Sequence, residues 1–196
     1  MESPALDKAS RRKELLAARR ALTSDEVAAA GAGLLASAQV RPEFQAARCV
    51  ALYLAMGTEP DTTPLLDWFR AHDVRVLLPL LYDDNDLGWG PADSGLHPGR
   101  LGLTEPLEDL GPNAIASAAL VICPALAIDL NGVRLGRGGG SYDRALARAA
   151  DVPIWAAVYP SEVVEALPRD AHDQYVDAAL TPSGLRVTNR SDVRQT

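Results

Sequence analysis

A glycine-rich stretch, Asn131–Leu146, has the composition of an anion-binding loop. Its sequence, NGVRLGRGGGSYDRAL, holds five glycines, three arginines and one aspartate. It lies between an apolar, strand-like run and a helix-like segment, so a glycine turn leads into the start of a helix. Backbone N–H groups and the positive end of the helix dipole at such a turn favour an anion, most often phosphate. Arg134 and Arg137 add charge-assisted hydrogen-bond donors.

This loop matches neither of two common nucleotide motifs. GRGGGS lacks the Gly-Lys-Ser/Thr ending of a Walker A loop, and Ser141 stands where G-x-G-x-x-G requires its last glycine. A second interpretation stays open on these residues alone. The glycines could serve only to reverse the chain closely against the sheet, with Asp143 as an ordinary residue of the first helical turn.

A second basic element lies near the N-terminus. Lys8, Arg12 and Arg19 fall within about 40° of one another on a helix that turns about 100° per residue. Such a stripe could cover bound phosphates, although a solvated basic face is the more common use of this pattern.

Acidic residues follow the first predicted strand, in MGTEPDTTP. Met56, Glu59 and Asp61 lie there at the carboxyl edge of a parallel strand, where ligands bind in open α/β sheets. An acid at this edge could accept hydrogen bonds from a donor-rich heterocycle. It could also cap the helix that begins near Pro64, a role that suits Asp61 or Thr62. The residues leave both interpretations open.

Two aspartates are candidates for a metal site. Asp177 lies in the apolar stretch QYVDAAL, and a buried aspartate needs a partner cation or a metal. Asp143 and Asp177 could share a magnesium ion, which takes a few carboxylates and completes its shell with substrate phosphates. The histidines have no mutual spacing typical of a triad or a zinc site, so we assign surface roles to His72, His97 and His172.

The elements that position these residues alternate between helix and strand. Residues 7–38 predict two helices separated at ALTSDEV, where Thr23 and Glu26 form a capping box. Helices are also expected within 63–72 and 141–150. Apolar runs predict four strands, at residues 48–55, 74–81, 119–128 and 153–159.

This alternation predicts an α/β fold with a mostly parallel sheet that helices cover on both faces. Residues 88–112 have no clear periodicity and much Gly and Pro, so we expect a long functional loop or a small irregular insertion there.

Composition narrows the classes of protein. With 196 residues, of which 47% are hydrophobic, we expect a single domain over residues 1–196. A net charge of −7 argues against a nucleic-acid partner. No apolar run approaches the roughly 18 to 20 residues of a membrane span, and the acids Glu2, Asp7 and Glu14 argue against a transit peptide. Cys49 and Cys123 lie in apolar runs and predict small buried side chains in a reducing compartment. We expect a cytoplasmic monomer without a membrane partner.

Four segments together make the chain resemble the 5-formyltetrahydrofolate cyclo-ligase family, from Lys8 to about Pro182. They are CPALAIDLNGVRLGRGGGSYDRAL, MGTEPDT, LGLTEP and AHDQYVDAALTP, and RLGRGGGSYDR is the most specific part. The resemblance implies the ATP- and magnesium-dependent conversion of 5-formyltetrahydrofolate to 5,10-methenyltetrahydrofolate, with release of ADP and phosphate. It also implies a three-layer α/β/α fold of the sugar-phosphate isomerase and CoA-transferase type.

The resemblance also implies residue roles. The family's metal-binding aspartates fall on Asp143 and Asp177. Its folate loop falls on Met56, Glu59 and Asp61, which leaves open which acid holds the pterin. Its nucleotide-binding residues fall on Lys8, Arg12, Arg134, Leu135, Gly136, Arg137, Gly138, Gly139, Gly140, Ser141 and Tyr142.

Among these residues we expect Arg134, Arg137 and Asp143 to act in catalysis, and Gly138 and Tyr142 to contact the folate as well. The family often has Tyr-Tyr-Asp where this chain has Ser141, Tyr142 and Asp143. One aromatic wall of the folate pocket is therefore expected to be missing, or to be supplied by Trp89 or Tyr82.

The implied reaction accounts for the residue types. A formamide oxygen is a poor leaving group, so ATP first phosphorylates the N5-formyl oxygen, after which N10 attacks the activated carbon and phosphate departs. Such chemistry requires positioning and charge neutralisation by amides, arginines and magnesium more than a protein nucleophile. Another class stays open on the sequence alone: a nucleotide- or folate-binding relative without catalysis, or a sugar-phosphate enzyme of the same fold.

Overall fold

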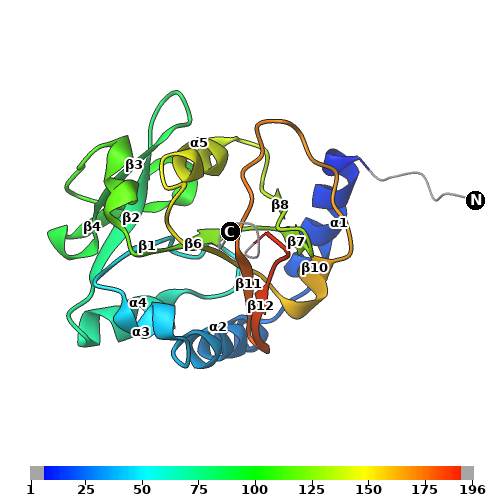
Figure 1. Ribbon diagram of the computed structural model, residues 1–196, viewed down its shortest axis with the longest axis horizontal. Helices are drawn as coiled ribbons and strands as arrows, with labels where there is room; N and C mark the ends of the chain where they lie inside the picture. The colour runs from blue at the N-terminus through cyan, green and yellow to red at the C-terminus, as the bar shows by residue number, and fades with distance from the viewer. Residues whose placement is uncertain (1–6, 191–196) are drawn as a thin grey trace, which may run out of the picture.

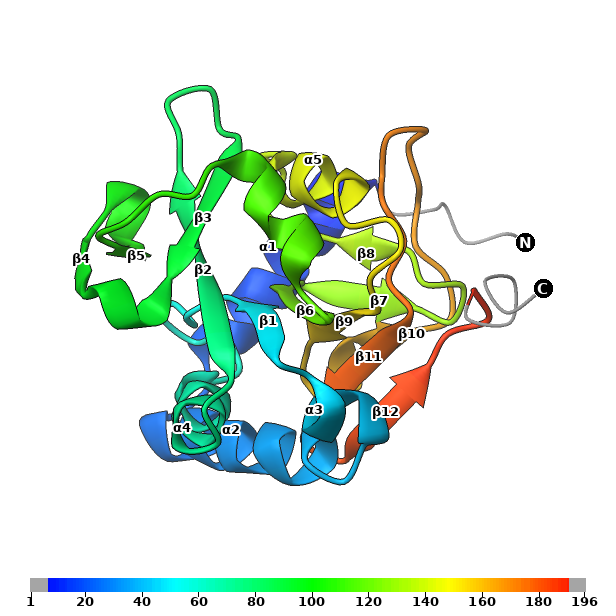
Figure 2. The same ribbon diagram turned by 60° about the vertical axis from the view of Figure 1, so that its left-hand side comes forward.

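The computed structural model describes residues 7–190. Residues 1–6 and 191–196 lie outside this part, and so does Glu2, one of the acids that argue against a transit peptide. Its centre is a seven-stranded sheet with the order β12-β11-β9-β6-β1-β2-β3 (Figures 1 and 2). The five inner strands pair in parallel, and the two edge strands pair antiparallel. The strands are β1 (Cys49–Leu52), β2 (Arg75–Leu81), β3 (Leu87–Pro91), β6 (Leu120–Pro124), β9 (Ile154–Ala157), β11 (Ala178–Thr181) and β12 (Gly184–Val187).

Helices cover both faces of this sheet (Figure 1). Leu34, Phe44 and Phe69 pack from three helices against one face, and Ile115 and Leu146 pack against the other. The predicted three-layer α/β/α arrangement with a mostly parallel sheet is therefore confirmed. The helices on the first face are α2 (Ser24–Ala38), α3 (Pro42–Ala46) and α4 (Thr63–Ala71), and those on the second are α5 (Ser141–Ala147) and the 3-10 helix η3 (Pro112–Ser117).

The first helix, α1 (Lys8–Arg20), packs away from the main sheet. Leu15 contacts Leu126, Ala127 and Leu135 in a small cluster, so α1 lies on a second, three-stranded sheet. The small sheet consists of β10 (Val163–Val164), β7 (Ala127–Asp129) and β8 (Arg134–Leu135).

Local signals set the boundaries of the N-terminal helices as predicted. Asp7 caps α1 by accepting the N–H of Ser10 at 2.7 Å. Thr23 Oγ1 accepts the N–H of Glu26 at 3.3 Å, and Glu26 Oε2 accepts the N–H of Thr23 at 2.8 Å. This reciprocal pair is the expected capping box, and it starts α2.

The run predicted as one strand over residues 119–128 is two strands in different sheets. β6 ends at Pro124, whose ring removes the N–H that a continued ladder would require, and β7 begins at Ala127. The glycine-rich loop therefore follows the small sheet rather than the main one. Two further strands, β11 and β12, were not among the four predicted strands.

The expectation of an irregular segment over residues 88–112 is wrong for its first part. Leu87–Pro91 is a buried edge strand, β3, which pairs with β2. A Cβ on Gly90 would lie 1.8 Å from the Glu108 carbonyl oxygen, so glycine is there to let another backbone segment approach the strand. The rest of the segment forms the 3-10 helices η1 (Ala92–Ser94) and η2 (Arg100–Gly102) and the two-stranded sheet of β4 (Leu96–Pro98) and β5 (Thr104–Pro106).

Both cysteines are free thiols within apolar strands, as expected. Cys123 is buried, and burial raises the pKa of its thiol to about 11, so it stays a neutral core residue. Cys49 is only half-buried, so the expectation of a buried side chain is wrong for this residue. No helix within residues 7–190 has the length and the apolar character needed to cross a membrane.

Candidate active site

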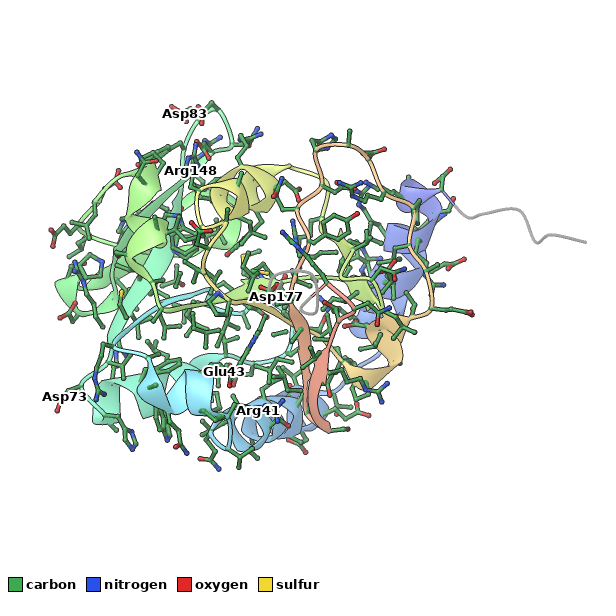
Figure 3. All side chains as sticks on the ribbon, in the orientation of Figure 1. Arg41, Glu43, Asp73, Asp83, Arg148 and Asp177 are labelled. Atoms are coloured by element: carbon green, nitrogen blue, oxygen red, sulfur yellow. The ribbon has the colours of Figure 1, made fainter. Side chains whose placement is uncertain are left out.

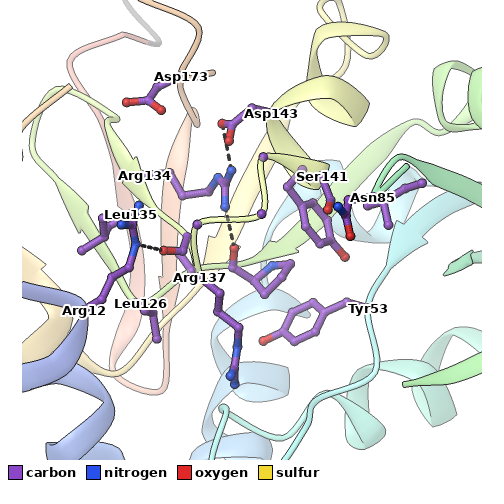
Figure 4. A pocket seen from close by; sticks show the side chains of 18 of the residues that line it. Arg12, Tyr53, Asn85, Leu126, Arg134, Leu135, Arg137, Ser141, Asp143 and Asp173 are labelled. Atoms are coloured by element: carbon purple, nitrogen blue, oxygen red, sulfur yellow. Dashed lines mark hydrogen bonds and ion pairs between the residues drawn. The ribbon is translucent and has the colours of Figure 1, made fainter. Parts of the chain in front are cut away.

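A pocket of about 1070 Å³ opens where the carboxyl ends of β1, β2 and β6 meet (Figure 4). This is the edge at which ligands bind in open α/β sheets, and the volume is sufficient for a nucleotide and a second substrate. Its wall is formed by the start of α1, the loop after β1, the β2–β3 hairpin, the glycine-rich loop and residues 168–173.

The glycine-rich loop runs from β8 into α5 along one wall of this pocket. Gly138 and Gly140 have φ angles of 102° and 69°, which residues with a side chain rarely adopt. Gly136 has no room for a Cβ, which would lie 2.8 Å from Arg134 Nη1. Gly139 has neither constraint, because a Cβ there would meet only Ser141 Oγ, at 3.4 Å. The backbone conformation thus explains Gly138 and Gly140, and the contact with Arg134 explains Gly136. Neither reason applies to Gly139.

Arg134 and Asp143 form a pair beneath this loop. Arg134 Nη2 lies 2.9 Å from Asp143 Oδ1, and the two side chains are 3% and 16% exposed. The same oxygen accepts the N–H of Gln174 at 3.2 Å. Within residues 7–190, Oδ2 of Asp143 has no hydrogen-bond partner. The two contacts of Oδ1 orient the carboxylate, and Oδ2 is free to bind a ligand in the pocket that Asp143 lines.

Lys8 and Arg12 reach the pocket from α1. Arg12 Nε donates to the Gly136 carbonyl at 2.8 Å, which ties the helix to the glycine-rich loop (Figure 4). Lys8 forms ion pairs with Asp170 and Asp173, which also line the pocket. Burial lowers the pKa of Lys8, but the hydrogen bonds to these carboxylates outweigh it and raise that pKa, so the ammonium stays charged.

Arg19 does not belong to this basic stripe. It is 3% exposed, its Nε lies 2.7 Å from Glu162 Oε1, and its Nη2 donates to the Ala125 carbonyl at 2.7 Å. The packing of α1 against the small sheet turns Arg19 inward, so neither the phosphate-covering nor the solvated-face interpretation holds for it. It anchors α1 instead.

The two acids after β1 have different surroundings. Glu59 lines the pocket, is 6% exposed, and accepts Arg137 Nε at 3.0 Å and Arg137 Nη2 at 2.9 Å. Asp61 is outside the pocket, and its Oδ1 accepts the N–H of Thr63 at the start of α4. The capping interpretation therefore fits Asp61, and Glu59 with Met56 remains at the site.

Comparisons with known proteins identify the family of this chain. The model of the 5-formyltetrahydrofolate cyclo-ligase family matches residues 5–182. The chain belongs to this family. It is 38% identical over 143 residues to the cyclo-ligase of Mycolicibacterium smegmatis, which covers 69% of this chain and 74% of that protein. It is 32% identical over 175 residues to the Escherichia coli K12 cyclo-ligase, and this match covers 84% of this chain and 94% of that protein.

Solved structures show the same fold. The 5,10-methenyltetrahydrofolate synthetase of Aquifex aeolicus superposes with a TM-score of 0.80 at 30% identity, over 93% of each chain. The synthetase of Mycoplasma pneumoniae gives a TM-score of 0.72 at 20% identity, over 90% of this chain and 99% of that one. The chain is a cyclo-ligase that converts 5-formyltetrahydrofolate to 5,10-methenyltetrahydrofolate, and the family implies that it uses ATP.

The expected aromatic wall of the cyclo-ligase pocket is not formed by Trp89 or Tyr82. Trp89 is 1% exposed in β3 and packs edge-on to Tyr142, 6.4 Å between ring centroids, so it supports Tyr142 from behind. Tyr82 donates to Asp109 Oδ2 at 2.7 Å, outside the pocket. Tyr142 itself lines the pocket, next to Ser141.

Asp177 is not brought to the cyclo-ligase pocket. It precedes β11, whereas the pocket opens at the carboxyl ends of strands that run in the same direction (Figure 3). Its Oδ2 accepts the N–H of Ile154 at 2.8 Å, which joins β11 to β9. The expectation that Asp143 and Asp177 share a magnesium ion is therefore not supported by the geometry.

Several pocket residues had no assigned role in the sequence. Tyr53 ends the apolar run of β1, and its place at a strand's carboxyl edge was the only signal. Of the histidines, His72 and His97 lie away from the pocket, whereas His172 is on its rim, although its side chain is 73% exposed. Further pocket residues without an assigned role include Leu81, Asn85, Leu101, Leu103, Thr104, Asp170 and Asp173.

Proposed function

We propose that this pocket holds ATP and 5-formyltetrahydrofolate side by side and that the residues of the glycine-rich loop lie between them. The observation that carries the proposal is the convergence on one pocket of cations from α1 and β8, the glycine-rich loop, and an acid on the facing wall. The ATP-dependent appearance of methenyltetrahydrofolate absorbance from 5-formyltetrahydrofolate tests the activity directly. An inactive folded protein would contradict it.

The nucleotide lies along the α1 side of the pocket in this proposal. Lys8 and Arg12 bind phosphate oxygens, and the loop of Gly138, Gly139 and Gly140 presents backbone N–H groups. Lys8 leaves the Asp170 and Asp173 carboxylates, or shares them, when the phosphates enter. Arg134 keeps the loop and Asp143 in register through its ion pair.

The folate lies on the facing wall. Glu59 accepts hydrogen bonds from the N–H groups of the pterin, and Met56 and Tyr142 pack against its ring. Arg137 is 51% exposed and paired with Glu59, so it can turn from this acid toward the phosphates. Leu81, Leu101 and Leu103 provide apolar surface for the remainder of the substrate.

Magnesium fits this site through one protein ligand. Asp143 offers one carboxylate oxygen while the other is held by Arg134 and Gln174, and Mg²⁺ takes one or two carboxylates plus substrate phosphates and water. When bound, the ion would neutralise charge on the transferring phosphoryl group. A ligand role for Asp177 is not part of this proposal.

The residues then position two successive steps. The N5-formyl oxygen takes the γ-phosphoryl group of ATP, with Arg134 and Arg137 balancing the developing charge. N10 next forms a bond to the formyl carbon, the carbon–oxygen bond breaks, and the oxygen leaves with phosphate as N10 loses its proton. The products are 5,10-methenyltetrahydrofolate, ADP and phosphate. A cytoplasmic monomer stays a prediction, which cell fractionation and size-exclusion chromatography check.

Arg12→Ala is expected to raise the KM for ATP about tenfold, roughly 1.4 kcal/mol of lost charge-assisted hydrogen bonding, and to leave the KM for folate nearly unchanged. Steady-state kinetics with each substrate varied in turn measures both values. Arg11→Ala is the matched control, because Arg11 pairs with Glu14 on the outside of the same helix. Equal changes in both KM values, or none, would remove α1 from the phosphate site.

A further inference from the structure

Tyr53 is a buried pocket residue outside the nucleotide and folate sets assigned above. It follows β1 directly and is 3% exposed. Thr62 Oγ1 donates to the Tyr53 carbonyl at 2.7 Å and accepts the N–H of Ala55 at 3.0 Å, so the backbone here is fixed from both sides. The ring therefore has a set position at the edge of the sheet where substrates bind.

The hydroxyl of Tyr53 is buried, and within residues 7–190 it has no hydrogen-bond partner. Such groups are rare in folded proteins, because an unpaired buried group has lost its water without a replacement. Burial and then the nearby Glu59 carboxylate raise the pKa of Tyr53 well above its usual value, so the hydroxyl stays protonated. It is a donor that the protein itself leaves unused.

We propose that Tyr53 is a substrate-binding residue whose hydroxyl donates a hydrogen bond to an acceptor atom of the bound folate. The proposal rests on the placement of folate against Met56 and Glu59 that is proposed above. In this role Tyr53 replaces the aromatic side chain that Ser141 does not provide, and it adds a polar contact that a phenylalanine would lack.

The position of the hydroxyl favours folate over the nucleotide. Met56 and Glu59 follow Tyr53 within six residues and line the pocket with it. Arg12 lies on the opposite side of the pocket (Figure 4). In the same view the hydroxyl points toward the guanidinium end of Arg137, which is 51% exposed and paired with Glu59. A ring that displaces Arg137 from Glu59 therefore also reaches Tyr53. An acid beside a phenol suits a heterocycle with both donors and acceptors, and does not suit a polyphosphate.

Tyr53→Phe tests this proposal, since it removes the hydroxyl and keeps the ring. We expect the Kd of 5-formyltetrahydrofolate to rise about tenfold, roughly 1.4 kcal/mol. The Kd of a non-hydrolysable ATP analogue stays within about twofold, because that ligand does not touch Tyr53. The melting temperature of the ligand-free protein stays the same or rises, because the lost hydroxyl had no partner. Calorimetric titration and an apo melting curve give these values.

Tyr175→Phe is the matched control, since Tyr175 lies outside the pocket and stacks with Arg169, and it leaves both Kd values unchanged. An unchanged folate Kd in Tyr53→Phe overturns the proposal, and so does an equal weakening of both ligands or a fall in apo stability. Glu59→Gln separates this failure from that of the folate placement. If Glu59→Gln weakens folate binding and Tyr53→Phe does not, only the role of Tyr53 is rejected. If neither variant weakens folate binding, the proposed placement of folate is rejected as well.

Discussion

Asp143→Asn is expected to lower kcat at least about a thousandfold, which corresponds to about 4 kcal/mol of activation free energy. A neutral amide is a much weaker magnesium ligand than a carboxylate, so in the proposed site the transferring phosphoryl group would lose its counter-ion. The fold should persist, because an asparagine Oδ1 still accepts from Arg134 Nη2 and from the N–H of Gln174. Turnover is measured per folded molecule, with the folded fraction taken from urea unfolding.

Three controls sharpen this experiment. Asp67→Asn makes the same chemical change on the exposed side of α4 and should leave kcat unchanged. Asp177→Asn should lower stability through its contact with Ile154 but keep turnover per folded molecule. Binding of a non-hydrolysable ATP analogue with and without magnesium provides a readout independent of catalysis, because the gain from magnesium should vanish in Asp143→Asn. Normal activity in a folded Asp143→Asn protein would remove this residue from the metal site.

Gly139→Val is expected to weaken ATP binding at least tenfold, on the order of 1.4 kcal/mol, without lowering the stability of the ligand-free protein. The backbone at Gly139 is acceptable for any residue, and a Cβ there meets only Ser141 Oγ at 3.4 Å. The valine methyl groups therefore intrude on a phosphate rather than on the protein. Titration of the folded variant with a non-hydrolysable ATP analogue, paired with an apo melting curve, measures both quantities.

Two companion variants distinguish the phosphate role from the turn role. Gly139→Ala should have a smaller effect in the same direction, because its side chain is shorter. Gly140→Ala should lower apo stability by roughly 1 kcal/mol, because Gly140 has a φ of 69° and a left-handed conformation costs a residue with a Cβ about that much. If Gly139→Val behaves like Gly140→Ala and retains its ATP affinity, the glycines serve only the turn.

The local sequence was sufficient for the elements whose signals lie within a few residues. The capping box of Thr23 and Glu26 involves atoms three residues apart, and the structure contains it. The glycine-rich loop and the start of α5 were also predictable, because positive φ angles at Gly138 and Gly140 are a property of the chain at those positions. Edge strand β3 was missed, since its Gly90 serves a backbone contact with Glu108 that no local pattern reveals.

Some residues of the pocket were predictable, among them Lys8 and Arg12, but their partners were not. A helical stripe placed Lys8, Arg12 and Arg19 on one face, yet only the packing of α1 on the small sheet turned Arg19 toward Glu162, 143 positions away. In the same way, Arg137 pairs with Glu59 across 78 positions, and Glu59 rather than Asp61 lines the pocket.

The amino-acid sequence alone was enough to predict the alternation of helices and strands, the glycine-rich loop that leads into a helix, and the family that these segments resemble. Only the packing of distant elements joins β11 to β9 through Asp177, sets Trp89 against Tyr142, and leaves the Tyr53 hydroxyl without a partner among the described residues. The physical reason is that periodicity and turn chemistry specify which way a side chain points from its own element. What that side chain meets depends on how elements distant in the sequence pack together.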